Sequence, residues 1–253
     1  MANYNSADVT LLVGPYDLTN VSNKFEDSVS DPAVDTTPFG VDAAEFGKPG
    51  VRKYELTGHD GWYDDAATSI NAAMVSLAAG EHVLMLLQGN TAGIAAHTHA
   101  ICAAGVLKTG YKRGFSVGDF TKANMELAVS GAKDEASLAC PYAEYAGDGN
   151  TQATYVDLGA AGGGTTGGHV YMSCTALALT GSTNLILTLE DSANHIAWAD
   201  NKAFTALVAV GAEMKEADAT VDRYLSVKRV WTGLAGAPTA TFVVAIKVHD
   251  PHA

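Results

Sequence analysis

Apolar and polar positions alternate over short stretches in the first half of the chain, a pattern typical of β-strands. Between Asp64 and Gly80 the pattern changes, because apolar residues such as Ile70 and Met74 recur at helical spacing between an acidic start and a glycine. We therefore expect one α-helix, near residues 65–79. The expected strands are Arg52–Gly58, His82–Gln88, Ala95–Leu107 and Asn124–Val129.

The second half contains four more apolar or alternating stretches and no helical pattern. Short turn-rich connections separate them, which predicts a small antiparallel β-sandwich. The expected strands are His169–Leu179, Asn184–Leu189, Val221–Trp231 and Thr239–Val248.

A glycine-rich stretch separates the two halves. Six glycines fall within residues 159–168, and no charged residue follows Asp157 there. This composition is typical of a flexible junction. We expect a mainly β protein, with a β-barrel or sandwich domain and its flanking helix over 1–150, the junction over 151–168, and a β-sandwich domain over 169–253.

Composition excludes several classes of protein. The chain has 28 acidic and 15 basic residues and a formal charge of −13, which argues against a protein that grips nucleic acid through phosphate contacts. The start of the chain lacks the pattern of a secretory signal, and the stretch Ala72–Leu87 is too interrupted to cross a membrane. The three cysteines, Cys102, Cys140 and Cys174, are expected to be buried thiols.

The segment Gly114–Gly118 matches the G-x-S-x-G motif of serine hydrolases, with Ser116 as the nucleophile. That motif requires a buried strand before the serine and a helix after it, whereas polar, turn-like residues precede this one. Asp200 and His249 occur in the right order for a triad, but a chain with this many acids and histidines supplies such partners by chance. We expect no catalytic residue here.

His97 and His99, followed by Cys102, have a spacing that can bind zinc from one strand. No paired ligand spacing supplies the remaining positions, so we expect no metal site. The glycines of 162–164 and 167–168 lack the G-K-[ST] of a phosphate-binding loop, and no acidic motif marks a calcium loop. The sequence therefore predicts no cofactor.

The first 150 residues resemble the tail tube proteins of long-tailed (siphophage-type) bacteriophages. In that family a similar progression precedes a helix like the one expected here. The resemblance rests on these segments: Gly14-Pro15-Tyr16-Asp17-Leu18-Thr19, Lys24-Phe25-Glu26, Val34–Gly40, Lys48-Pro49-Gly50, Tyr54–Gly58 and Val117-Gly118-Asp119-Phe120.

The second half is similar to a β-sandwich module of phage virion proteins. The similarity rests on Gly168–Tyr171, Leu187–Ser192 with Trp198, Val221–Leu225 and Ala240–Ala245. The alanine- and histidine-rich piece Gly93–Ala104 departs from the family pattern.

These resemblances imply a structural protein of the virion tail, made in the host cytoplasm. Subunits would close into stacked, hexameric rings through their own strand edges and would contact other tail proteins. DNA would pass through the lumen without binding, because acidic residues repel its phosphates.

Three other functions remain open from the sequence. A capsid decoration protein uses the same β modules on a preformed shell. A carbohydrate-binding virion protein would stack sugars on Trp198, Trp231 and Tyr224. An enzyme would be a hydrolase with Ser116 as its nucleophile.

Overall fold

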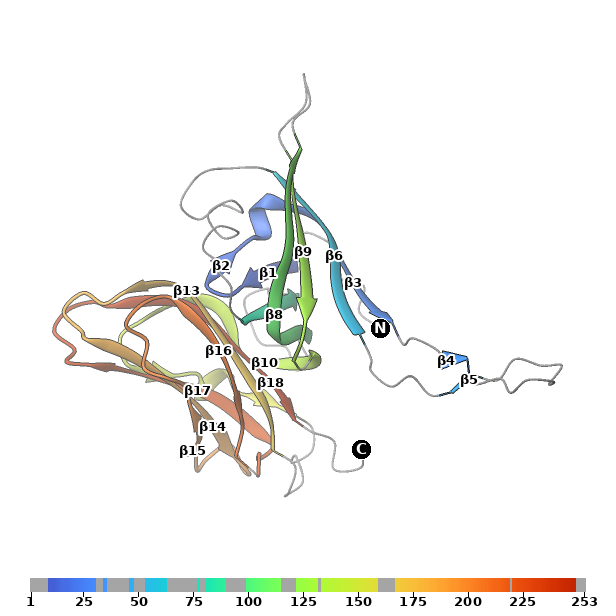
Figure 1. Cartoon of the computed structure of the whole chain (residues 1–253). Coiled ribbons are helices and arrows are strands. Elements are labelled where there is room, and N and C mark those ends of the chain that lie inside the picture. The colour runs from blue at the N-terminus through green and yellow to red at the C-terminus, as the bar shows by residue number, and fades with distance from the viewer. Residues whose placement is uncertain are drawn as a thin grey trace. The chain divides into compact units, whose positions relative to one another are not determined.

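The computed structural model shows a mainly β protein, as the sequence predicts (Figure 1). It describes residues 9–30, 34–35, 46–47, 53–62, 77, 81–89, 99–114, 122–131, 133–158, 167–218 and 220–248. The helical elements in these ranges are two short 3-10 turns, η2 (Thr19–Val21) and η3 (Gln152–Thr154). The helix expected near 65–79 lies outside the described residues except for Leu77, which is buried.

The chain forms two compact units that are not consecutive halves. Unit 1 comprises Met1–Asn20, Glu81–Ala104 and Lys133–Ala253, and unit 2 comprises Val21–Gly80 and Gly105–Ala132. These bounds differ from the domains expected at 1–150 and 169–253. The cause is strand pairing over a long sequence distance, which local patterns do not reveal.

Unit 1 contains two antiparallel sheets. The first has the order β16-β13-β18-β10-β8-β7-β1-β2, and the second has the order β11-β17-β14-β15 with β12 also beside β17. The strands of the first sheet are β1 (Val9–Val13), β2 (Tyr16–Asp17), β7 (His82–Gln88), β8 (His99–Gly114), β10 (Lys133–Ala146), β13 (Gly168–Ala178), β16 (Gly211–Glu216) and β18 (Thr239–Val248). Those of the second are β11 (Gly149–Asn150), β12 (Val156–Asp157), β14 (Asn184–Ser192), β15 (Ala199–Ala203) and β17 (Tyr224–Thr232).

The four strands expected in the second half are confirmed as β13, β14, β17 and β18. Two further strands, β15 and β16, were not expected. Their sequences, ADNKA and GAEMKE, are partly exposed throughout and carry charged residues, so they show no apolar alternation. Such composition is common in strands at a sheet edge, where both occur.

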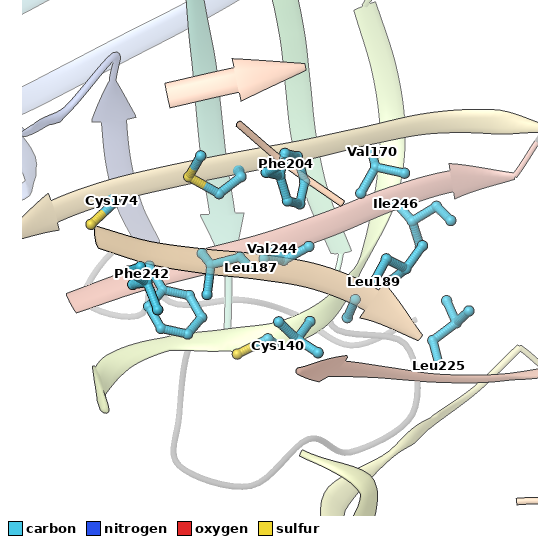
Figure 2. Close-up of a cluster of buried hydrophobic side chains, with 14 of the residues drawn as sticks. Cys140, Val170, Cys174, Leu187, Leu189, Phe204, Leu225, Phe242, Val244 and Ile246 are labelled. Atoms are coloured by element: carbon cyan, nitrogen blue, oxygen red, sulfur yellow. The ribbon is translucent and has the colours of Figure 1, made fainter. Parts of the chain in front are cut away.

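A sandwich core fills the space between the two sheets (Figure 2). Strands β10, β13 and β18 face β14 and β17 across it. Burial of these side chains away from water is the main source of stability for such a layer pair. Its labelled members in Figure 2 are Cys140, Val170, Cys174, Leu187, Leu189, Phe204, Leu225, Phe242, Val244 and Ile246.

The opposite face of the first sheet is also buried, in what we call the inner core. The sheet curls so that β7 lies against β13 and β16, although three strands separate β7 from β13 in the sheet. Residues from β1, β7, β8, β10, β13 and β18 meet there, including Leu12, Met85, Tyr171 and Val243. Residues 170–174 of β13 and 242–246 of β18 are buried on both faces, and these stretches are largely apolar, as in other doubly covered strands.

Unit 2 is a sheet with the order β3-β6-β9-β8. It consists of β3 (Ser22–Ser30), β6 (Lys53–Trp62), β9 (Lys122–Val129) and the stretch Val106–Gly114 of β8. In β9, apolar residues such as Met125 are buried and the intervening residues are exposed, so one face of this strand is packed. A separate ladder joins β4 (Val34–Asp35) to β5 (Phe46–Gly47).

Gly105 marks the point where β8 passes from unit 1 into unit 2. Its φ of +65° lies in the left-handed region, and an added Cβ would come within 2.7 Å of the Gly131 nitrogen. Ser130 donates from Oγ to the Gly105 carbonyl at 2.9 Å. A side chain at position 105 would therefore be strained.

Candidate functional site

Four aromatic side chains meet at one end of the second sheet of unit 1. We call Tyr155, His195, Trp198 and Tyr224 the aromatic cluster. The Tyr155 ring stacks on His195 at a centroid distance of 5.2 Å, and Trp198 is tilted against Tyr155 at 6.3 Å. The Tyr224 ring forms T-shaped pairs with Tyr155, at a centroid distance of 5.2 Å, and with His195, at 5.0 Å. These distances are those of favourable aromatic pairs.

Strand register brings the cluster together. Tyr224 begins β17 and pairs with Asp157 of β12 on one side and Ser192 of β14 on the other. Tyr155 directly precedes β12, and Trp198 directly precedes β15. Three of the four rings thus stand beside the ends of paired strands, which fixes their separation.

The loop between β14 and β15 supplies His195 in a defined conformation. The Asn194 Oδ1 accepts hydrogen bonds from the backbone N–H of Ile196 and of Ala197, both at 3.0 Å, and from Ser192 Oγ at 3.2 Å. His195 has a φ of 50° and is the one non-glycine residue with positive φ in the described ranges. The loop leaves the Ile196 side chain 79% exposed.

A polar pair flanks the cluster. The Arg223 guanidinium binds both carboxylate oxygens of Asp157, at 2.6 and 2.7 Å, and lies 5.0 Å from the Tyr224 ring centroid. The hydrogen bond to Asp157 raises the pKa of Arg223, so the guanidinium is charged throughout the accessible pH range. Both side chains remain partly exposed, at 41% and 32%, so their outer atoms face solvent.

A buried carboxylate lies in β14, one residue before Ser192. Asp191 is 5% exposed, and its Oδ2 accepts from the Asp222 backbone N–H at 3.0 Å and from Asn201 Nδ2 at 2.8 Å. Burial raises its pKa, those two hydrogen bonds lower it, and the charges of Asp222 and Asp218 raise it further. The net effect is a raised pKa.

We expect the substitution Asp191→Asn to raise the melting temperature at pH 7. A carboxyl whose pKa is raised on folding contributes stability below its unfolded value, near 3.8, and loses it as the pH rises through the folded value. The amide never ionises and keeps an acceptor for both donors. The gain in melting temperature should therefore vanish by about pH 3, as measured by thermal unfolding followed by circular dichroism.

Asp200→Asn is the matched control. Asp200 is an exposed partner of Lys228 at 2.6 Å, so its neutralisation should give no gain at pH 7. Lower stability of the Asp191→Asn protein at pH 7 would contradict the prediction, because the hydrogen bonds to the carboxylate would then outweigh its burial.

The residues weighed for hydrolase and metal chemistry do not come together in the described part of the chain. Ser116, His249 and His97 lie outside it. His99 is exposed, whereas Cys102 is fully buried on β8 and burial raises the pKa of its thiol. Among the residues that the structure describes, no group of histidine, cysteine and acidic side chains could hold a metal ion.

The glycines of the expected junction lie partly outside and partly inside the described residues. Gly162, Gly163 and Gly164 lie outside the described residues. Gly168 begins β13, and a Cβ there would collide with the Lys247 carbonyl of β18. The absence of a side chain at this position therefore serves close strand packing.

Of the three aromatics considered for sugar stacking, two belong to the cluster. Trp198 and Tyr224 are partly exposed there, whereas Trp231 is 3% exposed in the sandwich core. The sequence analysis missed Tyr155 and His195. They lie 40 residues apart in segments without a local motif, so only the pairing of β12, β14 and β17 reveals them.

No family model matches the chain, and no curated protein matches it in sequence. Among solved structures the chain is similar to the Dit protein (gp 19.1) of SPP1, described as a paradigm of the hub adsorption apparatus in phages that infect Gram-positive bacteria. The identity is 12% and the TM-score 0.31, over 94% of this chain and 98% of that one. No helix in the described ranges is long and apolar enough to cross a membrane.

Proposed function

We propose that this protein is a structural protein of a bacteriophage virion, and that it is a tail tube subunit which assembles with copies of itself into stacked rings. The mainly β fold and the segments that resemble tail tube proteins support this function. The observation that carries it is the open-edged sheet of unit 2.

Strand β3 forms one margin of that sheet. It is nine residues long and pairs with β6 alone among the described strands. A long edge strand presents unpaired backbone donors and acceptors, which invites pairing with another chain. Within unit 2 the opposite margin is the stretch Val106–Gly114 of β8. Pairing of these margins between neighbouring subunits would continue the sheet around a ring and remove its edges.

Charge supports the same assembly. In unit 2 the β8–β9 hairpin carries Lys108, Lys112, Arg113 and Lys122, and Lys112 pairs with Glu126 at 2.9 Å. This is a basic part of a chain whose net charge is −13. In a ring, the hairpin would complement an acidic neighbouring surface. Acidic residues elsewhere would face the lumen and repel the DNA backbone.

Negative-stain electron microscopy of the purified protein tests this function. We expect rings or tubes with a central channel, formed in a concentration-dependent manner. Dispersed monomers at every concentration would contradict the proposal. In whole virions, density for this chain should surround the tail channel, and density on the capsid surface would instead identify a decoration protein.

Proline substitutions in β3 sharpen the test. Successive backbone N–H groups of a strand point alternately toward and away from its partner, so of Asp27 and Ser28, which pair with Leu56 and Glu55, one directs its N–H away from β6. Of Asp27→Pro and Ser28→Pro, one should destabilise the β3–β6 ladder, and the other should remain folded but lose assembly. Normal assembly of the variant that remains folded would show that β3 is not a subunit contact.

A further inference from the structure

The aromatic cluster contains more exposed apolar surface than its place at a sheet end requires. A purely structural cluster gains most from full burial, as Trp231 shows in the sandwich core, yet three rings of the cluster are partly exposed and His195 is exposed. His195 also holds a positive φ, a conformation that non-glycine residues adopt infrequently. Such backbone outliers concentrate at binding sites, where surrounding contacts maintain them.

We infer that the aromatic cluster is a saccharide-binding site. The carbon-bound hydrogens on the face of a pyranose ring form an apolar surface that stacks on aromatic rings, while its hydroxyl groups need donors and acceptors at the rim. The cluster offers both, because the Arg223 guanidinium lies 5.0 Å from the Tyr224 ring centroid and the Arg223–Asp157 pair is partly exposed.

Contacts within the protein hold the cluster in place before a ligand arrives. The Asn194 hydrogen bonds fix the loop, strand register fixes Tyr224, and each ring is held by at least one other ring. Aromatic side chains have few rotatable bonds, so little conformational entropy is lost on binding. This preorganisation favours recognition of a weakly interacting neutral ligand.

Charge selects the class of ligand. Aromatic rings beside an arginine also stack nucleobases, but here the Asp157 carboxylate binds the Arg223 guanidinium through both of its oxygens and offsets its charge. Phosphate groups would therefore find no net positive charge in the pair. Neutral sugars and sugars with an amino group need no such charge, so the site suits these rather than nucleic acid or phosphorylated glycans.

The test uses the full chain and defined probes. Maltotetraose, cellotetraose, N-acetylchitotetraose, chitotetraose and a printed array of bacterial polysaccharides are screened, and hits are titrated by tryptophan fluorescence and calorimetry. A single-stranded DNA oligonucleotide serves as the comparison ligand. We expect at least one saccharide to bind and the oligonucleotide not to bind. Absence of any saccharide binding, or binding of the oligonucleotide alone, would overturn the inference.

Two variants locate the site. Trp198→Ala removes a stacking ring, and His195→Gly removes a ring while placing glycine where φ is 50°, so it should fold at least as well as the parent protein. Each should weaken saccharide binding about tenfold, the loss typical of one stacking partner. Leu234→Ala, at another exposed apolar position in unit 1, is the matched control and should bind normally.

Ring assembly of the same variants separates this inference from the proposed function. We expect Trp198→Ala and His195→Gly to assemble as the parent protein does. Unchanged saccharide affinity in both variants would overturn the inference, as would loss of assembly without loss of saccharide binding, which would identify the cluster as a subunit contact. Neither of these outcomes tests whether β3 is a subunit contact.

Discussion

The substitution Phe242→Ala should lower the free energy of unfolding of unit 1 by about 3–5 kcal/mol. Phe242 is 1% exposed in the sandwich core, and its ring lies 4.6 Å from that of Tyr145. Tyr145 is itself held in place, because its hydroxyl donates to the Pro141 carbonyl at 2.9 Å. The surroundings are therefore poorly able to collapse into the cavity. Guanidinium unfolding monitored by circular dichroism measures the effect.

Leu234→Ala provides the control for this measurement. It also removes apolar side-chain atoms, but Leu234 is 47% exposed in the turn between β17 and β18. We expect a change within about 0.5 kcal/mol. A Phe242→Ala protein as stable as this control would show that the two sheets of unit 1 do not pack as described.

The substitution Tyr171→Ala should have an effect of similar size, about 3–5 kcal/mol, on the other side of the same sheet. Tyr171 is fully buried in the inner core, and its hydroxyl donates to Asp134 Oδ2. Burial and this carboxylate both raise the pKa of Tyr171, so the hydroxyl stays protonated and remains a donor. The cavity left by the ring and the loss of this hydrogen bond both contribute to the expected destabilisation.

Tyr171→Phe separates the two contributions. It keeps the ring and removes the donor, while Asp134 keeps its contact with His169 Nδ1 at 2.7 Å. Because the acceptor is a carboxylate, we expect a loss of about 1.5–3 kcal/mol in the same unfolding experiment. A loss as large as that of Tyr171→Ala would mean that the hydrogen bond, rather than the packing of the ring, determines stability here.

Phe242→Ala and Tyr171→Ala should shift one common unfolding transition. Strands β13 and β18 contribute to both cores, so neither core can open without distorting strands that the other requires. Separate transitions for the two variants would contradict this coupling.

Strand identity in the second half could be predicted from the sequence because the signal is local. In β18 the run from Ala240 to Ile246 is apolar at almost every position, which identifies a covered strand. The sequence does not reveal that alternate members of this run enter two different cores. Phe242 and Val243 have similar hydrophobicity, and only the curl of the sheet distinguishes their environments.

The candidate site was less accessible to sequence reasoning than the fold. Residue type alone suggested Trp198 and Tyr224 as exposed aromatics, and it suggested Trp231 equally, although Trp231 is buried. Residue type and spacing do not show whether a side chain is exposed. Tyr155 and His195 join the cluster through the register of three strands, which is information about pairing at long range.

The position of β18 between β10 and β13 also sets an order of events during synthesis. Ser137 in β10 pairs with Ile246 in β18, so the ribosome delivers one partner long before the other. Until β18 emerges, apolar faces of β10 and β13 lack their central neighbour, and long-range pairing of this kind is slow and prone to aggregation. Neither core can close before then, so a nascent chain that stops short of β18 cannot complete unit 1.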